Sequence, residues 1–330
     1  MHALKSLAAI ALCMCFAAGA LAQAADWKAL NAEAIALYQK GELEPALAAG
    51  TRAVEAATAA LGADHPAVAT VLSNVARILD SQGRAADVQP LYMRVLAIRE
   101  KAFGSDHVEV AAALNNLGST YRDSGEPALA EPIFVRALAI REKSLAPDHP
   151  DVATSLNNLG VVYRAQGRYE LAEPLYRRAL TIREKVRGPE HLEVATSLNN
   201  LAALYDAQGD FEKAEPLYQR ALAIREKSLG PASLDVAASL NSLGELYLAQ
   251  RRYEKAEPLL QRALTIRTKT LAPKHPDRAA TTLDLWTLYV SRGELALAEQ
   301  YQQEGQVTET EDQRRKLSIP MPSPGRTPPR

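Results

Sequence analysis

Five of the six histidines recur at one position of a repeated word, so the first chemistry to weigh is metal binding. A metal ion holds imidazole nitrogens at about 2.0–2.1 Å. Equivalent residues of neighbouring helical repeats are instead separated by a packing distance of about 8–10 Å or more. We therefore expect no metal site, and we assign these residues to loop packing or to capping of the preceding helix. The five are His65, His107, His149, His191 and His275.

Carboxylates and arginines recur with the same spacing, which argues against catalysis because catalytic groups are rarely duplicated in every repeat. Repeated charges on helices are more often ion pairs on the exposed face. The sequence also contains no phosphate-binding glycine loop, no His-Glu-x-x-His word and no nucleophile elbow. It therefore predicts no catalytic residue, no cofactor and no enzymatic activity. The recurring charges are Glu131, Glu173, Glu215, Glu257, Arg136, Arg178, Arg220 and Arg262.

Adjacent asparagines are the third group of residues that could take part in binding chemistry. The stretch SLNNLGVVYRAQG, residues 155–167, returns 42 residues earlier as ALNNLGSTYRDSG and 42 residues later as SLNNLAALYDAQG. Asparagine is a mediocre helix former that favours caps and turns, so its place in mid-helix needs a reason. On a helical wheel that starts at Leu156, the apolar Leu159 and Tyr163 lie within about 60°, whereas Asn158 lies about 200° away. Asn158 is therefore predicted to face away from the packed side.

Two rows of polar side chains follow from this geometry. Each amide offers donors and acceptors, which suits an extended peptide that presents both groups at every residue. The alternative for both rows is that the amides brace neighbouring helices. The principal row is Asn74, Asn116, Asn158, Asn200 and Ser242, continued by Asp284. The flanking row is Asn115, Asn157, Asn199 and Asn241.

Two arginines lie beside the rows. Arg122 and Arg164 occupy one position of successive repeats, where they would give an acidic ligand a positive flank. Asp206 and Leu248 stand at that position in the next two repeats, so the positive flank is confined to the N-terminal half.

The element that must carry these residues is a pair of helices. In one unit we expect an A helix over residues 151–165 and a B helix over residues 169–185, separated by Gly167, which ends the first. Asp151 is expected to cap the A helix. Pro174 is expected near the first turn of the B helix, where its missing N–H is tolerated, and a deeper position would add a small kink.

Tyrosines, glycines and arginines keep the 42-residue period along the chain. The tyrosines are Tyr121, Tyr163, Tyr205, Tyr247 and Tyr289, and the arginines are Arg99, Arg141, Arg183, Arg225 and Arg267. The glycines are Gly41, Gly83, Gly125, Gly167 and Gly209, followed by Arg251 and then Gly293. Self-similarity at a fixed period of this length predicts a repeat architecture.

These words resemble the tetratricopeptide repeat, whose signature is Leu-Gly-x-x-Tyr on the first helix and Ala-x-x-x-aromatic on the second. Leu159-Gly160 with Tyr163, followed by Ala172 with Tyr176, shows the match. The period of 42 in place of 34 is similar to the longer subtype found in kinesin light chains. The resemblance implies an all-α, right-handed α-solenoid whose A helices line the concave wall. It also implies that asparagines at these A-helix positions contact bound peptides.

Both ends of the chain differ from the repeats. Residues 1–22 read as a signal peptide, because Lys5 precedes an apolar run of about 12 residues and a small-residue site that ends at Ala22. That run is shorter than the ~20 residues that span a bilayer, so we expect export to the periplasm or the exterior without stable membrane insertion. Both cysteines, Cys13 and Cys15, lie in this segment. The solenoid of about six to seven units is expected over residues 26–304, and a disordered proline-rich tail over residues 305–330.

The charge balance narrows the class of partner. Thirty-eight Lys and Arg residues against 39 Asp and Glu give a formal charge of −1, so the chain lacks the positive field that nucleic acid requires. The sequence therefore predicts a non-enzymatic, exported adaptor that binds a protein or peptide in the concave groove. The alternatives are a subunit that assembles through its outer faces or solenoid ends, and a regulatory subunit of an envelope enzyme. The sequence leaves the oligomeric state open.

Overall fold

The computed structural model describes residues 27–305, which form a series of helices with no strand among them. The predicted signal peptide, and the predicted tail beyond Gly305, lie outside the described residues. Residues 27–39 form the first A helix. The other helices are α2 (Leu43–Leu61), α3 (Pro66–Ser81), α4 (Ala85–Phe103), α5 (Val108–Asp123), α6 (Pro127–Ser144), α7 (Pro150–Ala165), α8 (Tyr169–Arg187), α9 (Leu192–Ala207), α10 (Phe211–Leu229), α11 (Leu234–Ala249), α12 (Tyr253–Thr270), α13 (Pro276–Arg292) and α14 (Leu295–Gly305).

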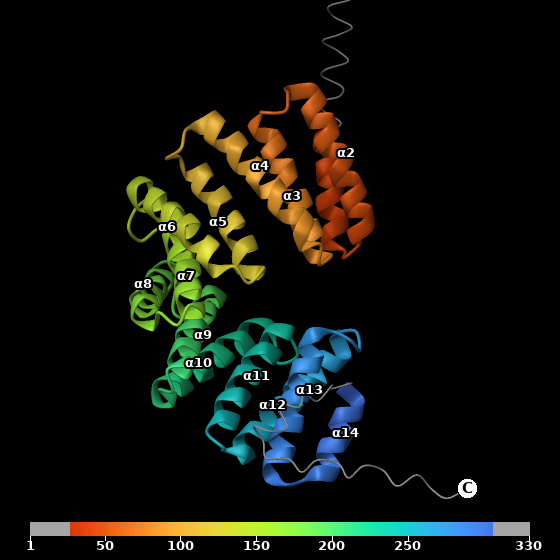
Figure 1. The fold of residues 1–330 in the computed structure, drawn as a ribbon, viewed down its shortest axis with the longest axis vertical. Helices are drawn as coiled ribbons and strands as arrows, with labels where there is room; N and C mark the ends of the chain where they lie inside the picture. Colours follow the sequence, from red (N-terminus) through yellow and green to blue (C-terminus); the bar gives the residue numbers. More distant parts are fainter. Residues whose placement is uncertain (1–26, 306–330) are drawn as a thin grey trace, which may run out of the picture. The chain divides into compact units, whose positions relative to one another are not determined.

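The described helices make seven A–B pairs, in which the even-numbered helices are the B helices (Figure 1). The chain divides into two compact units, residues 1–175 and 176–330, with the boundary inside α8. The predicted helices over residues 151–165 and 169–185 correspond to α7 and α8, with ends that differ by at most two residues. The prediction of an all-α repeat solenoid is confirmed.

Within each unit, the A helices form the inner layer. Helix α5 contacts α7 in the first unit, and α11 contacts both α9 and α13 in the second. Among the described residues, no two neighbouring B helices are in comparably close contact. Because the A helices are closer together than the B helices, each unit curves toward its A-helix side.

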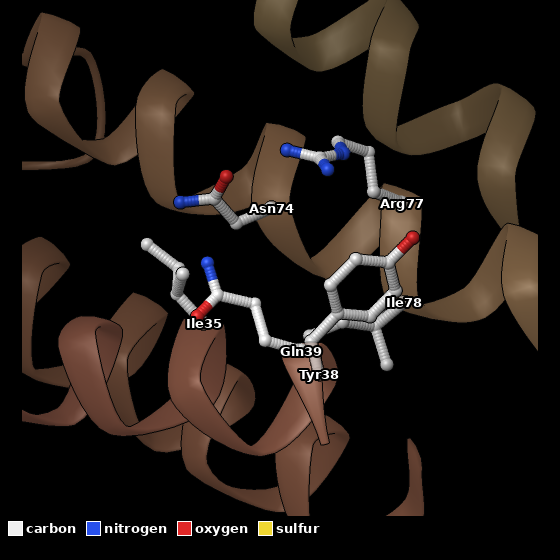
Figure 2. Close-up of a pocket in the computed structure, with 6 residues that line it drawn as sticks. All are labelled: Ile35, Tyr38, Gln39, Asn74, Arg77 and Ile78. Atoms are coloured by element: carbon white, nitrogen blue, oxygen red, sulfur yellow. The ribbon is translucent and has the colours of Figure 1, made fainter. Parts of the chain in front are cut away.

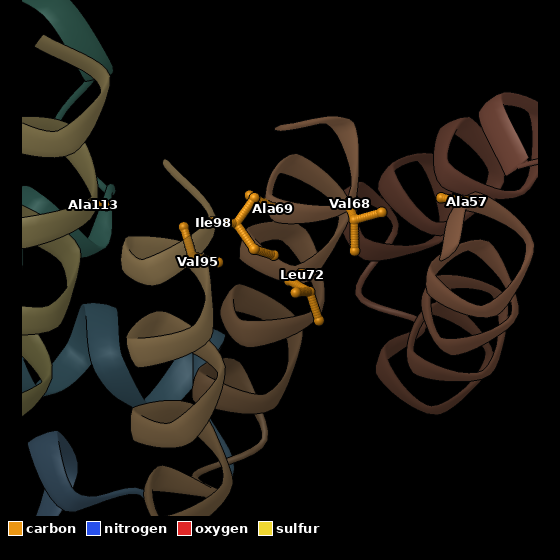
Figure 3. Packing of buried hydrophobic residues seen from close by; sticks show 7 residues of the cluster. All are labelled: Ala57, Val68, Ala69, Leu72, Val95, Ile98 and Ala113. Carbon is orange, nitrogen blue, oxygen red and sulfur yellow. The ribbon is translucent and has the colours of Figure 1, made fainter. Parts of the chain in front are cut away.

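The core continues from one repeat to the next. One cluster joins Ala57 of α2, Leu72 of α3, Ile98 of α4 and Ala113 of α5, so it includes residues of three successive repeats (Figure 3). Burying a Leu or Ile side chain stabilises a fold by about 1.5–3 kcal/mol. Since each repeat covers the apolar face of its neighbour, stability comes from stacking, as expected of a solenoid.

The glycine of the Leu-Gly-x-x-Tyr word is needed for close approach. A Cβ on Gly118 would lie 2.9 Å from ring atoms of Phe134, a fully buried residue of the paired B helix. In α9 the same position is Ala202, and the paired helix α10 carries Tyr218 where α6 has Phe134. A small residue at this position therefore lets the two helices of a repeat pack against each other.

The histidines cap the following helix, not the preceding one, so that part of the prediction was wrong. His149 is the N-cap of α7, and its Nδ1 accepts a hydrogen bond from the backbone N–H of Asp151 at 3.1 Å. Asp151 therefore lies in the first turn and is not the cap. The same bond is made by His65, His107, His191 and His275. Ser233 replaces the histidine before α11, and its Oγ accepts from the N–H of Val236 at 3.2 Å.

The repeated proline lies deeper in the B helix than the first turn. Pro174 is the sixth residue of α8, and Pro132, Pro216 and Pro258 hold the same place in α6, α10 and α12. Each removes one intrahelical hydrogen bond from the second turn. The deeper of the two predicted positions is therefore the observed one.

Candidate binding face on the A helices

The two asparagine rows are bonded to each other between neighbouring A helices. In the first unit, Nδ2 of Asn158 donates to Oδ1 of Asn115 at 2.9 Å, and Nδ2 of Asn74 donates to Oδ1 of Asn31 at 3.0 Å. In the second unit, Nδ2 of Asn241 donates to Oδ2 of Asp284 at 3.0 Å. Every one of these bonds joins residues 43 apart. The bracing alternative is therefore observed for these three pairs.

The rows differ in burial and in unused hydrogen-bonding capacity. In the flanking row Asn157 and Asn241 are buried, with 7% and 6% of their surface exposed. Asn115 and Asn199 of that row are half-buried, and so are all members of the principal row: Asn74, Asn116, Asn158, Asn200, Ser242 and Asp284. An amide has two N–H donors and two acceptor lone pairs, so one bond to a neighbouring helix leaves the others available.

Three row residues retain groups without a bond in the described part of the chain. The side chains of Asn116 and Ser242 make no hydrogen bond there. The Oδ1 atom of Asn199 is buried and has no hydrogen-bond partner among the residues described. The inner layer thus combines braced amides with open ones.

The first unit also carries a pocket of about 110 Å³ between its first two A helices. Figure 2 shows side chains of the helix at residues 27–39 facing side chains of α3 across it. Arg77 lies 5.4 Å from the ring centre of Tyr38, and the Tyr38 hydroxyl is 3.1 Å from Oγ of Ser81. The pocket is lined by Ile35, Tyr38, Gln39, Asn74, Arg77 and Ile78.

Sequence reasoning identified only Asn74 in this pocket. The first repeat departs from the motif, so the period does not mark Ile35, Tyr38 and Gln39. One signal was present: Tyr38 and Gln39 follow Ile35 by three and four residues, which places both beside Ile35 on the helix surface.

The predicted positive flank is smaller than the sequence suggested. Arg122 forms a bidentate ion pair with Asp123 of its own helix, at 2.8 and 3.1 Å, which offsets its charge. Arg164 is half-buried, and no ion pair to it is present in the described residues. Its Nε atom is buried without a hydrogen-bond partner. Of the two arginines, Arg164 keeps its charge unpaired.

A comparison of the sequence with models of protein families establishes the family to which the chain belongs. The tetratricopeptide repeat model matches residues 27–101, 89–143, 109–185, 151–227 and 235–305, so it covers well over half of the chain. The chain belongs to the tetratricopeptide repeat family. The comparison with curated protein sequences gives no match.

Among solved structures, the repeats are similar to those of kinesin light chains. A putative kinesin light chain from Podospora anserina is 28% identical, with a TM-score of 0.53, and the match covers 62% of this chain and 97% of that one. BtubC (BKLC) from P. vanneervenii is 26% identical, with a TM-score of 0.53, and covers 79% and 94%. A Rap protein complexed with competence and sporulation factor has a TM-score of 0.62 at 14% identity, covers 89% and 76%, and shares the fold.

Within the second unit of this tetratricopeptide protein, the inner layer carries acidic groups that the period does not predict. Glu245 lies one turn after Asn241, whose Nδ2 donates to its Oε1 at 2.6 Å. Below this pair, Arg267 is buried with 7% of its surface exposed and donates to Oδ1 of Asn241 at 3.0 Å. Burial and the charge of Asp284 raise the pKa of the Glu245 carboxyl to about 7.

The periodic arginines, among them Arg141 and Arg183, join one repeat to the next, a role that the sequence reasoning missed. Arg141 of α6 donates to Oγ of Ser155 at 2.7 Å and to the carbonyl oxygen of Asp151 at 2.9 Å, both in the next repeat. Burial lowers the pKa of Arg141. Arg183 bonds Ser197 and Glu193 in the same way at 2.7 and 3.3 Å. The pattern of a basic residue 14 positions before a Ser was the available signal.

The recurring surface charges link successive B helices. Arg136 pairs with Glu100 at 2.7 Å, Arg220 with Glu184 at 2.7 Å, and Arg262 with Glu226 at 2.6 Å. These ion pairs are exposed to solvent, where each contributes about 0–1 kcal/mol. No group of three or more His, Cys, Asp or Glu residues in the described chain is arranged to hold a metal ion. None of the helices within residues 27–305 is long and apolar enough to cross a membrane.

Proposed function

We propose that this protein is an exported, non-enzymatic scaffold that binds a protein or peptide segment across the inner, A-helix layer. The tetratricopeptide fold is suited to protein binding, and a Rap protein of similar fold holds a bound factor. The observation that carries the proposal is the polar lining of this layer, in which five of the six principal-row residues are uncharged Asn or Ser. Asn116 and Ser242, both half-buried, offer hydrogen-bonding groups that the described repeats do not use.

The spacing of the A helices suits an extended ligand. Packed helices lie about 8–10 Å apart, and an extended chain advances about 3.3 Å per residue. One row residue of each repeat can therefore meet about every third residue of the ligand. Each net hydrogen bond contributes about 0.5–1.5 kcal/mol, so affinity requires several repeats to act together.

A specific observation favours the assembly alternative. The B helices of the first unit expose large apolar side chains, among them Met93 at 52%, Leu129 at 51% and Leu171 at 44%. Single exposed apolar residues are common on protein surfaces. We therefore rank assembly through the outer B-helix faces second.

A peptide selection on the purified protein separates the two functions. Phage-displayed random peptides are selected on the wild-type protein, and the enriched sequences are synthesised and titrated by calorimetry. The test variant is Asn116→Glu with Ser242→Glu, which adds a carboxylate to the principal row of each unit without breaking an observed hydrogen bond. The control is Ala139→Glu with Thr265→Glu, which adds the same charges to exposed positions of the B helices of those repeats.

We expect the test variant to lose at least tenfold in affinity and the control to bind as the wild type does. Peptides that bind both variants equally would contradict the proposal. A change of oligomeric size in the control, measured by light scattering, would favour the assembly alternative.

A further inference from the structure

The pocket between the first A helix and α3 differs in chemistry from the rest of the inner layer. Its volume is about 110 Å³, well below the roughly 300–1,000 Å³ of sites that hold a small-molecule ligand. It therefore has room for one side chain of a larger ligand. Figure 2 shows that Ile35 and Gln39 approach it from the first helix, and that Asn74 and Arg77 approach it from α3.

One part of the lining is apolar. Ile78 has 2% of its surface exposed and belongs to a core cluster against which Tyr38 packs. Ile35 is different, because 37% of its surface is exposed. Apolar surface that faces water is covered favourably by methylene groups of a ligand. The pocket therefore suits a side chain with an apolar stem.

The other part of the lining is polar and carries one positive charge. Arg77 is exposed, and its guanidinium forms no ion pair or hydrogen bond within residues 27–305; it lies 5.4 Å from the ring centre of Tyr38. The amide of Gln39 makes no hydrogen bond in that range either, and Nδ2 of Asn74 uses one of its two N–H groups on the first helix. Asp80, one turn after Arg77, forms no ion pair with it there. The group that complements these donors is an anion.

A cation at the position of Arg77 occurs in one repeat only. The architecture therefore does not require an arginine there, and the chemistry of the pocket belongs to this one junction between repeats. In the other repeats the position is held, in chain order, by Ile35, Ser119, Val161, Ala203, Glu245 and Thr287.

We propose that this pocket takes one acidic side chain of the ligand, and that glutamate fits it better than aspartate. The ligand carboxylate pairs with Arg77, and the amides of Gln39 and Asn74 each have an N–H to donate to it. The methylene groups of the ligand side chain lie against Ile35 and Ile78. This inference rests on the proposed function, because it assigns the specificity of the same inner layer at its N-terminal end.

The position of the pocket favours a side chain over the carboxyl terminus of a ligand. Arg77 and Ile78 follow Asn74 by three and four residues, so the pocket lies about one helical turn, about 5.4 Å, from the principal row. A ligand backbone that follows the row passes beside the pocket, and one of its side chains turns into it. The longer stem of glutamate spans this distance better than that of aspartate.

Affinity measurements on capped peptides test the assignment. Peptides are selected from a random library on the wild-type protein, synthesised with acetylated and amidated ends, and titrated by calorimetry. Each acidic residue of a selected peptide is replaced in turn by Gln, and each Glu also by Asp. The test variants are Arg77→Gln and Arg77→Glu. The control is Arg52→Gln, which removes the same charge from an exposed position of α2.

We expect glutamate to be enriched at one position of the selected peptides. Its replacement by Gln should lower the affinity for the wild type about tenfold, as expected for the loss of a charged partner, and replacement by Asp should lower it less. Arg77→Gln should bind the Glu and Gln forms equally, because the two groups act as a pair. Arg77→Glu should prefer a Lys form, and Arg52→Gln should bind as the wild type does.

Two results would overturn this inference and leave the proposed function intact. One is a set of selected peptides that require no acidic residue, and the other is a loss from Glu to Gln that persists in Arg77→Gln. A free carboxyl terminus that restores binding of the Gln form would assign the pocket to a terminal carboxylate and overturn the inference as well. If the wild type enriches no peptide, the proposed function fails and this subsite fails with it.

Discussion

At the scale of single residues, the repeat imposes a backbone conformation even where the residue does not favour it. Arg251 stands where most repeats have glycine, and it adopts the same left-handed conformation, with φ of 58° against 73° at Gly167. Its neighbour closes the turn as elsewhere, because the N–H of Arg252 donates to the carbonyl oxygen of Tyr247 at 2.8 Å. A non-glycine residue in this region costs about 1–2 kcal/mol.

Replacing this residue should therefore stabilise the protein. We expect Arg251→Gly to raise the free energy of unfolding by about 0.5–1 kcal/mol, since the relief of strain exceeds the entropy that glycine adds to the unfolded chain. The reciprocal change, Gly209→Arg, should lower it by about 1 kcal/mol. Urea unfolding followed by circular dichroism measures both. A lower midpoint for Arg251→Gly would refute this account.

At the scale of helices, buried arginines join each repeat to the next. Arg183 of α8 has 6% of its surface exposed, and its guanidinium reaches the hydroxyl of Ser197 and the backbone of Glu193 in α9. A buried charged donor is stabilising only while it has acceptors, because its loss of hydration must be offset. The hydroxyl at the sixth position of α7, α9, α11 and α13 therefore supplies an acceptor to the periodic arginine of the preceding B helix.

Removing that hydroxyl should weaken the junction between repeats. We expect Ser197→Ala to lower the free energy of unfolding by about 1–3 kcal/mol, because it leaves a donor of Arg183 buried without a partner. Ser228→Ala, an exposed change on α10, serves as the control and should stay within about 0.5 kcal/mol of wild type. Urea unfolding of the three proteins measures the difference. Equal losses for both variants would show that the buried bond is not the cause.

At the scale of the whole molecule, the proposal of export rests on residues 1–22, which lie outside the described residues. We expect the protein recovered from the envelope of exporting cells to begin at Gln23, because Ala20 and Ala22 form the small-residue site that signal peptidase recognises. N-terminal sequencing checks this. An Ala22→Asp variant should accumulate uncleaved, and a wild-type protein that retains Met1 in the cytoplasm would contradict export.

The sequence by itself determined the helices, because their signals are local. The stripe of Leu156, Leu159 and Tyr163 and the turn at Gly167 recur every 42 residues, and each acts within one helix or one turn. A helical wheel places Asn158 about 200° from Leu156 on its own helix. It could not show that Asn158 bonds Asn115, because a wheel describes one helix and not the offset between two.

Only the tertiary structure decided which polar groups are used up between helices. Stacking brings residues 43 apart to within hydrogen-bonding distance, which braces Asn74 and Asn158, leaves Asn116 open, and brings Asn241 to Asp284. That pairing depends on the rotation and height of one A helix against the next. Both are determined by how the apolar faces of adjacent repeats fit together, a property that no single repeat contains.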